Sequence, residues 1–244
     1  HSSHRRQRQM CIRDSIYYSH PAGKIEKKFL QYIKVFAEPK DQEHLEALEK
    51  GFIYSNDHGK EYWMQSRGTR CDLSKYDVEN PVIDDLRIEF NSSWSDKHYT
   101  IFKQFCQKKN FKMYDEDTYI IPENSPIADN LVSYYYKDKL VAWSKLRYFR
   151  EASTYETNLF IWDYSNPKLK LGENSFIMEL NWIKDKTTGY AYLGPGYERS
   201  SIYKADIPGF EWWTGKEWSS DKEVFKDLCK NDSTIRSLND LINS

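Results

Sequence analysis

Residues 131–193 contain three strand-like segments in succession, followed by a helical pattern and one more strand. The first two segments are separated by a tight polar turn at residues 137–139, and Gly189 precedes the last strand. In the helical pattern, apolar residues recur three and four positions apart behind Gly172. These segments are residues 131–136, 140–148 and 154–162, the helix from Leu171 to Lys184, and the strand from Tyr190 to Leu193.

This order predicts an antiparallel meander, then a helix, then a strand that joins the sheet. It is similar to the central unit of the GNAT acyltransferase fold, in which neighbouring strands splay apart and leave a cleft for the acyl donor. We therefore expect an α+β fold (an α/β sandwich) with a central antiparallel or mixed sheet flanked by helices. One flanking helix is predicted from Ser95 to Lys109. A smaller N-terminal α+β region is expected to precede this unit.

Four segments are predicted along the chain. Residues 1–15 are basic, almost free of apolar side chains and unlike the rest, which predicts a disordered artefact of sequencing or processing. The alternative is a basic arm for RNA. Residues 16–92 are predicted to form an N-terminal subdomain, residues 93–218 the GNAT-like catalytic domain, and residues 219–244 a helical tail.

Composition narrows the classes of partner. A net charge of −1 over 244 residues gives no global basic field, so DNA is not expected and any RNA contact must come from local patches. No stretch reaches the roughly 18 consecutive apolar residues of a membrane helix, which predicts a cytoplasmic protein without a membrane partner. Four scattered cysteines form no Cys-x-x-Cys pair, so neither a metal site nor a disulfide framework is expected.

The second half of the chain contains a set of short motifs at fixed spacing. They are Tyr192-Leu193-Gly194, Ser201-Ile202-Tyr203-Lys204-Ala205, Pro208, Glu211 and Gly215-Lys216-Glu217-Trp218. This set resembles the C-terminal signature of arginyl- and leucyl-tRNA–protein transferases. The strand-end Asp163, the Leu171-Gly172 turn and the helix residue Glu179 are similar to the same family.

The first half resembles this family more faintly. Residues 62–76 align with its cysteine-rich loop, but this chain has Ser66, Thr69 and Asp72 where the family often has cysteines, and Cys71 lies one position off that register. A single thiol cannot hold zinc or an iron–sulfur cluster, so the loop is degenerate.

The resemblance implies an aminoacyltransferase that moves arginine or leucine from charged tRNA to the N-terminal amine of acceptor proteins, those that begin with Asp or Glu. Aminoacyl-tRNA would be a co-substrate, and no cofactor is implied. Such aminolysis needs aligned substrates, a stabilised oxyanion and a proton acceptor, but no covalent enzyme intermediate.

Three residues are the predicted catalytic groups. Glu179 lies two helical turns after Gly172 and is the first choice to bind or deprotonate the amine; the alternative is a solvated helix carboxylate. Asp163 is the second choice, with a turn residue as its alternative. Tyr203, beside Lys204, is expected to face the terminal adenosine or the ester carbonyl. The alternative for Tyr203 is a tyrosine packed in the core, and the alternative for Lys204 is an ordinary surface charge.

Further residues are assigned to substrate binding by position. Trp213 is a candidate for stacking on a base. Adjacent residues on a strand face opposite ways, so at most one of Trp212 and Trp213 lines a given surface. The predicted substrate-binding set is Gly172, Tyr192, Gly194, Lys204 and Trp213, and the predicted tRNA-binding set is Lys168, Lys170, Lys108 and Lys109.

Two other functions stay open. An acetyl-CoA-dependent N-acetyltransferase would share the fold, but Leu169, Gly172 and Asn174 fill the pyrophosphate-loop positions, two of which need other residues. The second alternative is an inactive homologue that binds tRNA or protein N-termini without transfer.

Overall fold

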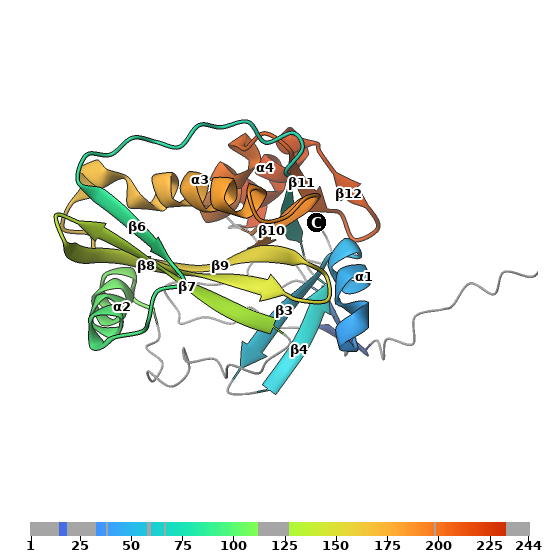
Figure 1. Cartoon of the computed structure of the whole chain (residues 1–244). Helices are drawn as coiled ribbons and strands as arrows, with labels where there is room; N and C mark the ends of the chain where they lie inside the picture. Colours follow the sequence, from blue (N-terminus) through green and yellow to red (C-terminus); the bar gives the residue numbers. More distant parts are fainter. Residues whose placement is uncertain are drawn as a thin grey trace, which may run out of the picture.

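The chain folds into two β-sheets with helices packed on them (Figure 1). The computed structural model describes residues 15–18, 33–37, 39–57, 60–65, 67–111, 127–197 and 199–232. Within these residues the fold is α+β, with a large mixed sheet flanked by helices, as the sequence predicts. Residues 1–14 of the predicted artefact lie outside the described residues, whereas Ser15 is the first residue of a strand.

The smaller sheet is antiparallel and has the strand order β1-β2-β4-β3. Its β3–β4 hairpin follows a short helix, α1, and packs the buried Phe52, Tyr54 and Trp63 against Phe149 of the large sheet. Its elements are β1 (Ser15–Tyr18), β2 (Ile33–Ala37), η1 (Asp41–Glu43), α1 (His44–Glu49), β3 (Phe52–Asp57) and β4 (Lys60–Gln65).

The larger sheet has the order β12-β11-β5-β10-β9-β8-β7-β6. All neighbouring strands are antiparallel except β9 and β10, which are parallel. The strands are β5 (Gly68–Asp72), β6 (Leu86–Phe90), β7 (Ile127–Tyr136), β8 (Lys139–Phe149), β9 (Thr154–Trp162), β10 (Tyr190–Pro195), β11 (Phe210–Trp213) and β12 (Trp218–Ser219).

The predicted meander, helix and strand are confirmed as β7-β8-β9, α3 and β10. Helix α3 is the crossover that a parallel strand pair requires. In Figure 1, α3 lies above the large sheet and α2 below it. The helices and 3-10 turns of this part are α2 (Asp96–Lys109), η3 (Pro167–Leu169), α3 (Leu171–Lys184), η4 (Arg199–Asp206) and α4 (Lys222–Asn231).

Two strands that precede residue 93 belong to the large sheet, so this sheet extends across the expected boundary between residues 92 and 93. Strand β6 pairs with β7 at one side. Strand β5 lies between β10 and β11, although its residues were aligned with a cysteine-rich loop. The buried Cys71 of β5 therefore fills the core beside Leu73 and Leu193.

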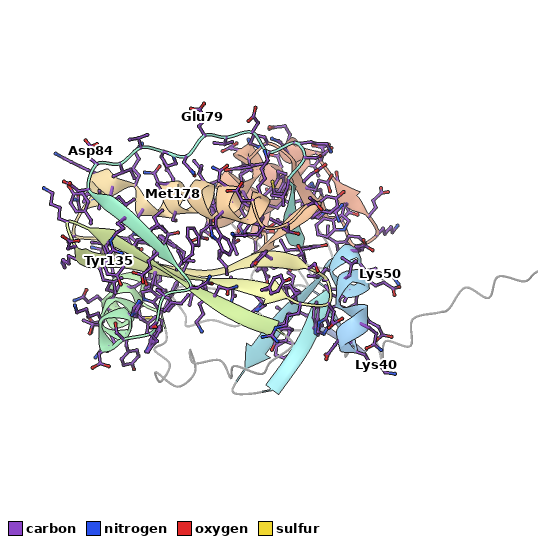
Figure 2. All side chains as sticks on the ribbon, viewed as in Figure 1. Lys40, Lys50, Glu79, Asp84, Tyr135 and Met178 are labelled. Atoms are coloured by element: carbon purple, nitrogen blue, oxygen red, sulfur yellow. The ribbon has the colours of Figure 1, made fainter. Side chains whose placement is uncertain are left out.

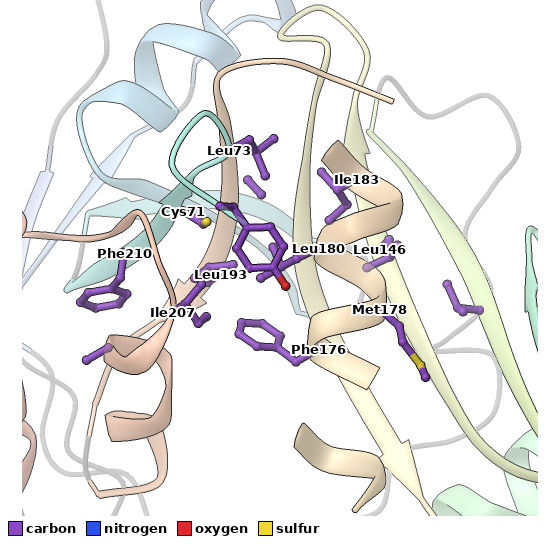
Figure 3. Close-up of a cluster of buried hydrophobic side chains, with 14 of the residues drawn as sticks. Cys71, Leu73, Leu146, Phe176, Met178, Leu180, Ile183, Leu193, Ile207 and Phe210 are labelled. Carbon is purple, nitrogen blue, oxygen red and sulfur yellow. The ribbon is translucent and has the colours of Figure 1, made fainter. Parts of the chain in front are cut away.

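Helix α3 is enclosed by core side chains on one side and by a chain segment on the other. Phe176, Leu180 and Ile183 face Leu193 and the end of β5 (Figure 3). The segment between β5 and β6, which carries Glu79 and Asp84, passes over α3 (Figure 2). There Lys184 Nζ donates to the Tyr76 carbonyl at 2.5 Å, and Asn181 donates to the Val78 carbonyl at 2.9 Å.

Among the described residues, no helix is long and apolar enough to cross a membrane. Within the same residues, no group of three or more His, Cys, Asp or Glu side chains is placed to hold a metal ion.

Gly51 offers a test of how α1 is joined to the sheets. Its φ is +74°, and a Cβ built there would lie 2.3 Å from Cγ of Trp213. Gly215 has a φ of +100° and nothing within 4 Å of such a Cβ. We expect Gly215→Ala to cost about 1 kcal/mol from backbone strain, and Gly51→Ala to cost about 3 kcal/mol because overpacking is added. Equal urea midpoints for the two variants would show that Trp213 does not restrict this turn.

Candidate active site

A cleft opens where β9 and β10 separate. Their parallel pairing is confined to Ala191 with Tyr155 and Tyr192 with Glu156, and the later residues of both strands line the cleft. The cavity is about 1070 Å³, just above the roughly 300–1,000 Å³ that is usual for small-molecule sites. It is bounded by α3 and η4 from one face of the sheet, and by β3, β4 and the end of α2 from the other.

Lys204 binds the backbone of β10 where this strand separates from β9. Its ammonium is buried and donates to the carbonyls of Leu193 at 2.5 Å and of Pro195 at 2.9 Å. The carbonyl between them, on Gly194, accepts from the Thr69 hydroxyl at 2.8 Å. Burial lowers the pKa of Lys204 to about 8, although the charge of Glu156 opposes this shift.

Glu179 is the buried carboxyl group of the cleft. It lies on α3, is only 3% exposed, and lines the cavity. Its Oε1 accepts a hydrogen bond from the Tyr134 hydroxyl at 2.6 Å and another from the Ser144 hydroxyl at 2.5 Å. Since both bonds fall on Oε1, Oε2 is the oxygen available to a substrate N–H or O–H group.

The electrostatic environment makes Glu179 a proton acceptor near neutral pH. Burial raises its pKa from the ordinary 4.5 to about 7, because desolvation outweighs the hydrogen bonds from Ser144 and Tyr134 that favour the charged form. Burial and the neighbouring carboxylate raise the pKa of Tyr134 well above its usual value, so Tyr134 stays protonated and donates. A group of this pKa can both accept and return a proton at pH 7.

Asp163 lines the same cleft, but its carboxylate already has hydrogen-bond and ion-pair partners. Its carboxylate accepts from the Ser165 amide and hydroxyl, both at 2.8 Å, and lies 3.4 Å from Lys139 Nζ. Burial acts to raise its pKa, but these three donors prevail and the pKa lies below its ordinary value. Asp163 therefore fixes the turn after β9 and is a weak base.

The structure brings only part of the predicted site together. Glu179, Asp163, Tyr203, Gly172, Gly194, Lys204, Lys170 and Lys109 line the cleft. Tyr203 is 45% exposed there, and its ring packs edge-on against Phe176. Tyr192 and Trp213 are buried away from the cleft lining, Tyr192 beside Leu48 and Trp213 against Gly51. Lys108 and Lys168 are exposed and do not line it.

Sequence reasoning missed Tyr134 and Ser144, the two donors that orient Glu179. Both are on the strand faces that turn toward α3 and alternate there with apolar residues of the core. A polar residue at a core-facing strand position was the signal for them, because such a group requires a hydrogen-bond partner when buried. Lys204 was assigned to substrate binding, whereas its ammonium holds two backbone carbonyls.

Comparisons with known proteins return only partial structural likenesses. No protein-family model matches the chain, and no curated protein sequence matches it. One similar solved structure is the C-terminal domain of a protein designated a lysylphosphatidylglycerol synthetase from Agrobacterium fabrum, with a TM-score of 0.44 and 11% identity. Another is L-PGS from Bacillus licheniformis, with a TM-score of 0.39 and 11% identity.

The likenesses cover part of each protein. They include 62% and 68% of this chain, and 50% and 57% of the two solved structures in the same order. The chain therefore spans little more than half the length of the structures that it resembles. At these TM-scores and identities the likeness supports no assignment of function.

These comparisons contradict the resemblance to arginyl- and leucyl-tRNA–protein transferases. The two solved structures named above are a lysylphosphatidylglycerol synthetase domain and L-PGS, not tRNA–protein transferases, so the expected transfer of arginine or leucine to protein N-termini is wrong. The acceptor-protein partners and the Asp or Glu specificity are withdrawn with it. The residues of the cleft are the remaining indication of function.

The raised pKa of Glu179 predicts an unusual pH dependence of stability. Between pH 4.5 and 7 the folded chain retains a proton on Glu179 that the unfolded chain has lost, so this group's contribution to stability falls as pH rises through 7. Glu179→Gln removes the buried charge. The free energy of unfolding of this variant, relative to that of the native chain, should therefore be higher at pH 8.5 than at pH 5 by on the order of 2 kcal/mol.

Urea unfolding at the two pH values measures this gain. Glu79→Gln, an exposed site on the segment over α3, is the matched control and should show none. If Glu179→Gln differs in stability from the native chain by the same amount at pH 5 and at pH 8.5, Glu179 is ionised in the folded chain at both pH values.

Proposed function

We propose that this chain is an acyltransferase in which Glu179 deprotonates the acceptor nucleophile. The observation that carries the proposal is the buried carboxyl group with its pKa near 7, one oxygen fixed by Tyr134 and Ser144, in a cleft between diverging parallel strands. We also infer that β7-β8-β9, α3 and β10 form a GNAT-type unit, because the crossover and the separating strand pair occur in that order.

The form of the cleft supports transfer between two bound substrates. Its walls come from both faces of the large sheet, so a donor and an acceptor can approach from different sides. The described residues that line it include no cysteine and no histidine, which are the groups that usually supply or activate a covalent nucleophile. Direct attack of the acceptor on the donor is therefore the step that these residues support.

The proton balance of that step needs only Glu179. The acceptor's N–H or O–H group attacks the acyl carbonyl, and the Glu179 carboxylate takes its proton. The tetrahedral oxyanion then collapses, the bond from the acyl carbon to the donor's sulfur or oxygen breaks, and the Glu179 carboxylic acid returns the proton to that leaving atom. The Tyr134 and Ser144 hydroxyls keep the carboxyl oriented in both forms.

The test is acyl transfer by the full chain from two donors, acetyl-coenzyme A and an aminoacyl-tRNA, to a mixture of primary amines and alcohols. Loss of donor is followed over time. We expect kcat/KM to rise with pH to a plateau above the pKa of about 7. Glu179→Gln should reduce it by roughly 10²- to 10⁴-fold, the usual range for a general base. Glu79→Gln should leave it unchanged. If the native chain consumes neither donor faster than Glu179→Gln does, the proposal is wrong.

A further inference from the structure

A row of aromatic rings lies along the end of β9 that is not paired with β10, and continues into the turn after this strand. Phe160 and Trp162 are stacked with ring centroids 5.3 Å apart, and Tyr164 continues the row at 5.0 Å from Trp162. All three side chains line the cleft and are half-buried. We call these three residues the aromatic row.

Cationic groups gather at the same place. Lys109, from the end of α2, lies with its Nζ 5.5 Å from the Trp162 ring centroid and 5.7 Å from that of Tyr164. Lys170 lines the cleft directly before α3, whose N-terminus carries a partial positive charge. The acidic Asp163 is offset by Lys139, and Glu173, the residue after Gly172, is an exposed carboxylate that also lines the cleft.

Space next to the row is kept open by a glycine. A Cβ at Gly172 would lie 3.8 Å from Cζ2 of Trp162, so any larger side chain at this position would reach over the indole. The Tyr164 hydroxyl is buried and has no hydrogen-bond partner among the described residues. The cleft wall thus offers aromatic rings with two ammonium groups beside them.

We propose that the aromatic row binds the base of a nucleotide that forms part of the acyl donor, with Lys109 and Lys170 next to its phosphate. This rests on the proposed acyl transfer and names the donor class for the same cleft. Aromatic side chains stack on any base through its π-face, and ammonium groups supply phosphate contacts. An acyl donor without a base would use the lysines but not the rings.

The position of the row relative to Glu179 fits this arrangement. Gly172, beside Trp162, and Glu179 are seven residues apart on α3, a rise of roughly 10 Å along the helix. The base would therefore lie at one end of the cleft and the acyl carbon near Glu179. Donors that carry a nucleotide joined to an acyl group include a coenzyme A thioester and an acyl ester on the 3′ end of an RNA.

The experiment measures binding of adenosine 5′-monophosphate to the full chain by calorimetry, without any acyl group. Trp162→Leu should weaken binding by roughly 10-fold or more, whereas Trp162→Phe should retain most of it. The matched control is Trp182→Leu. Trp182 is also half-buried and stacked, on Phe90 at 4.6 Å, but it does not line the cleft, so this variant should bind normally.

Charge variants and two larger probes complete the test. Lys109→Met should weaken adenosine 5′-monophosphate but not adenosine, and Glu173→Gln should tighten the nucleotide by a few fold. Coenzyme A and an RNA oligonucleotide ending in CCA distinguish the two donor types, because the true source should bind more tightly than the mononucleotide and lose that binding in Trp162→Leu.

The outcomes separate this inference from the proposed function. If Trp162→Leu and Trp182→Leu bind the nucleotide equally well, or if the native chain binds none of the three probes, the nucleotide site is ruled out. Loss of transfer in Glu179→Gln would still support acyl transfer in that case. Conversely, selective loss of nucleotide binding in Trp162→Leu together with full activity in Glu179→Gln would uphold the site and reject Glu179 as the base.

Discussion

The hydrogen bonds from one buried ammonium group determine the form of this molecule's central cleft. Lys204 donates to the carbonyls of Leu193 and Pro195 at the point where β10 leaves β9. Taking an ammonium group out of water costs several kcal/mol unless its donors are satisfied. The carbonyls of Leu193 and Pro195 meet this need, and Thr69 of β5 binds the carbonyl between them. Strand β10 pairs with β5 as far as Pro195, whereas its pairing with β9 ends at Tyr192.

The position of Glu179 follows from the same arrangement. In a closed sheet, a carboxyl group on the core side of α3 would lie among Phe176, Leu180 and other apolar residues with no route to solvent. The open gap places it at the edge of a cavity, while the core still limits its hydration. Hence the pKa rises to about 7, and the buried group is both costly to fold and suited to proton transfer.

The regular elements could be predicted from the sequence, but the contacts that make the site could not. Strands β7 to β9 and helix α3 are long and strongly periodic, and their order was recognised correctly. Strand β5 was missed, because Gly68–Asp72 contains glycine, arginine and aspartate without alternation, and it enters the sheet only through partners more than a hundred residues away. For the same reason Lys204 was assigned to substrate binding, since no local pattern reveals which carbonyls a lysine will meet.

The resemblance read from short motifs failed for a related physical reason. Gly194 supplies left-handed backbone in β10, and Lys204, from η4, supplies the buried cation that binds the carbonyls on either side of it. Both residues serve the backbone of the fold, and a fold does not identify a substrate. The motif therefore marks where β10 separates from β9, and it does not identify the substrate. The chemistry of the cleft depends on what its walls add, namely the carboxyl of Glu179 and the aromatic row at the end of β9.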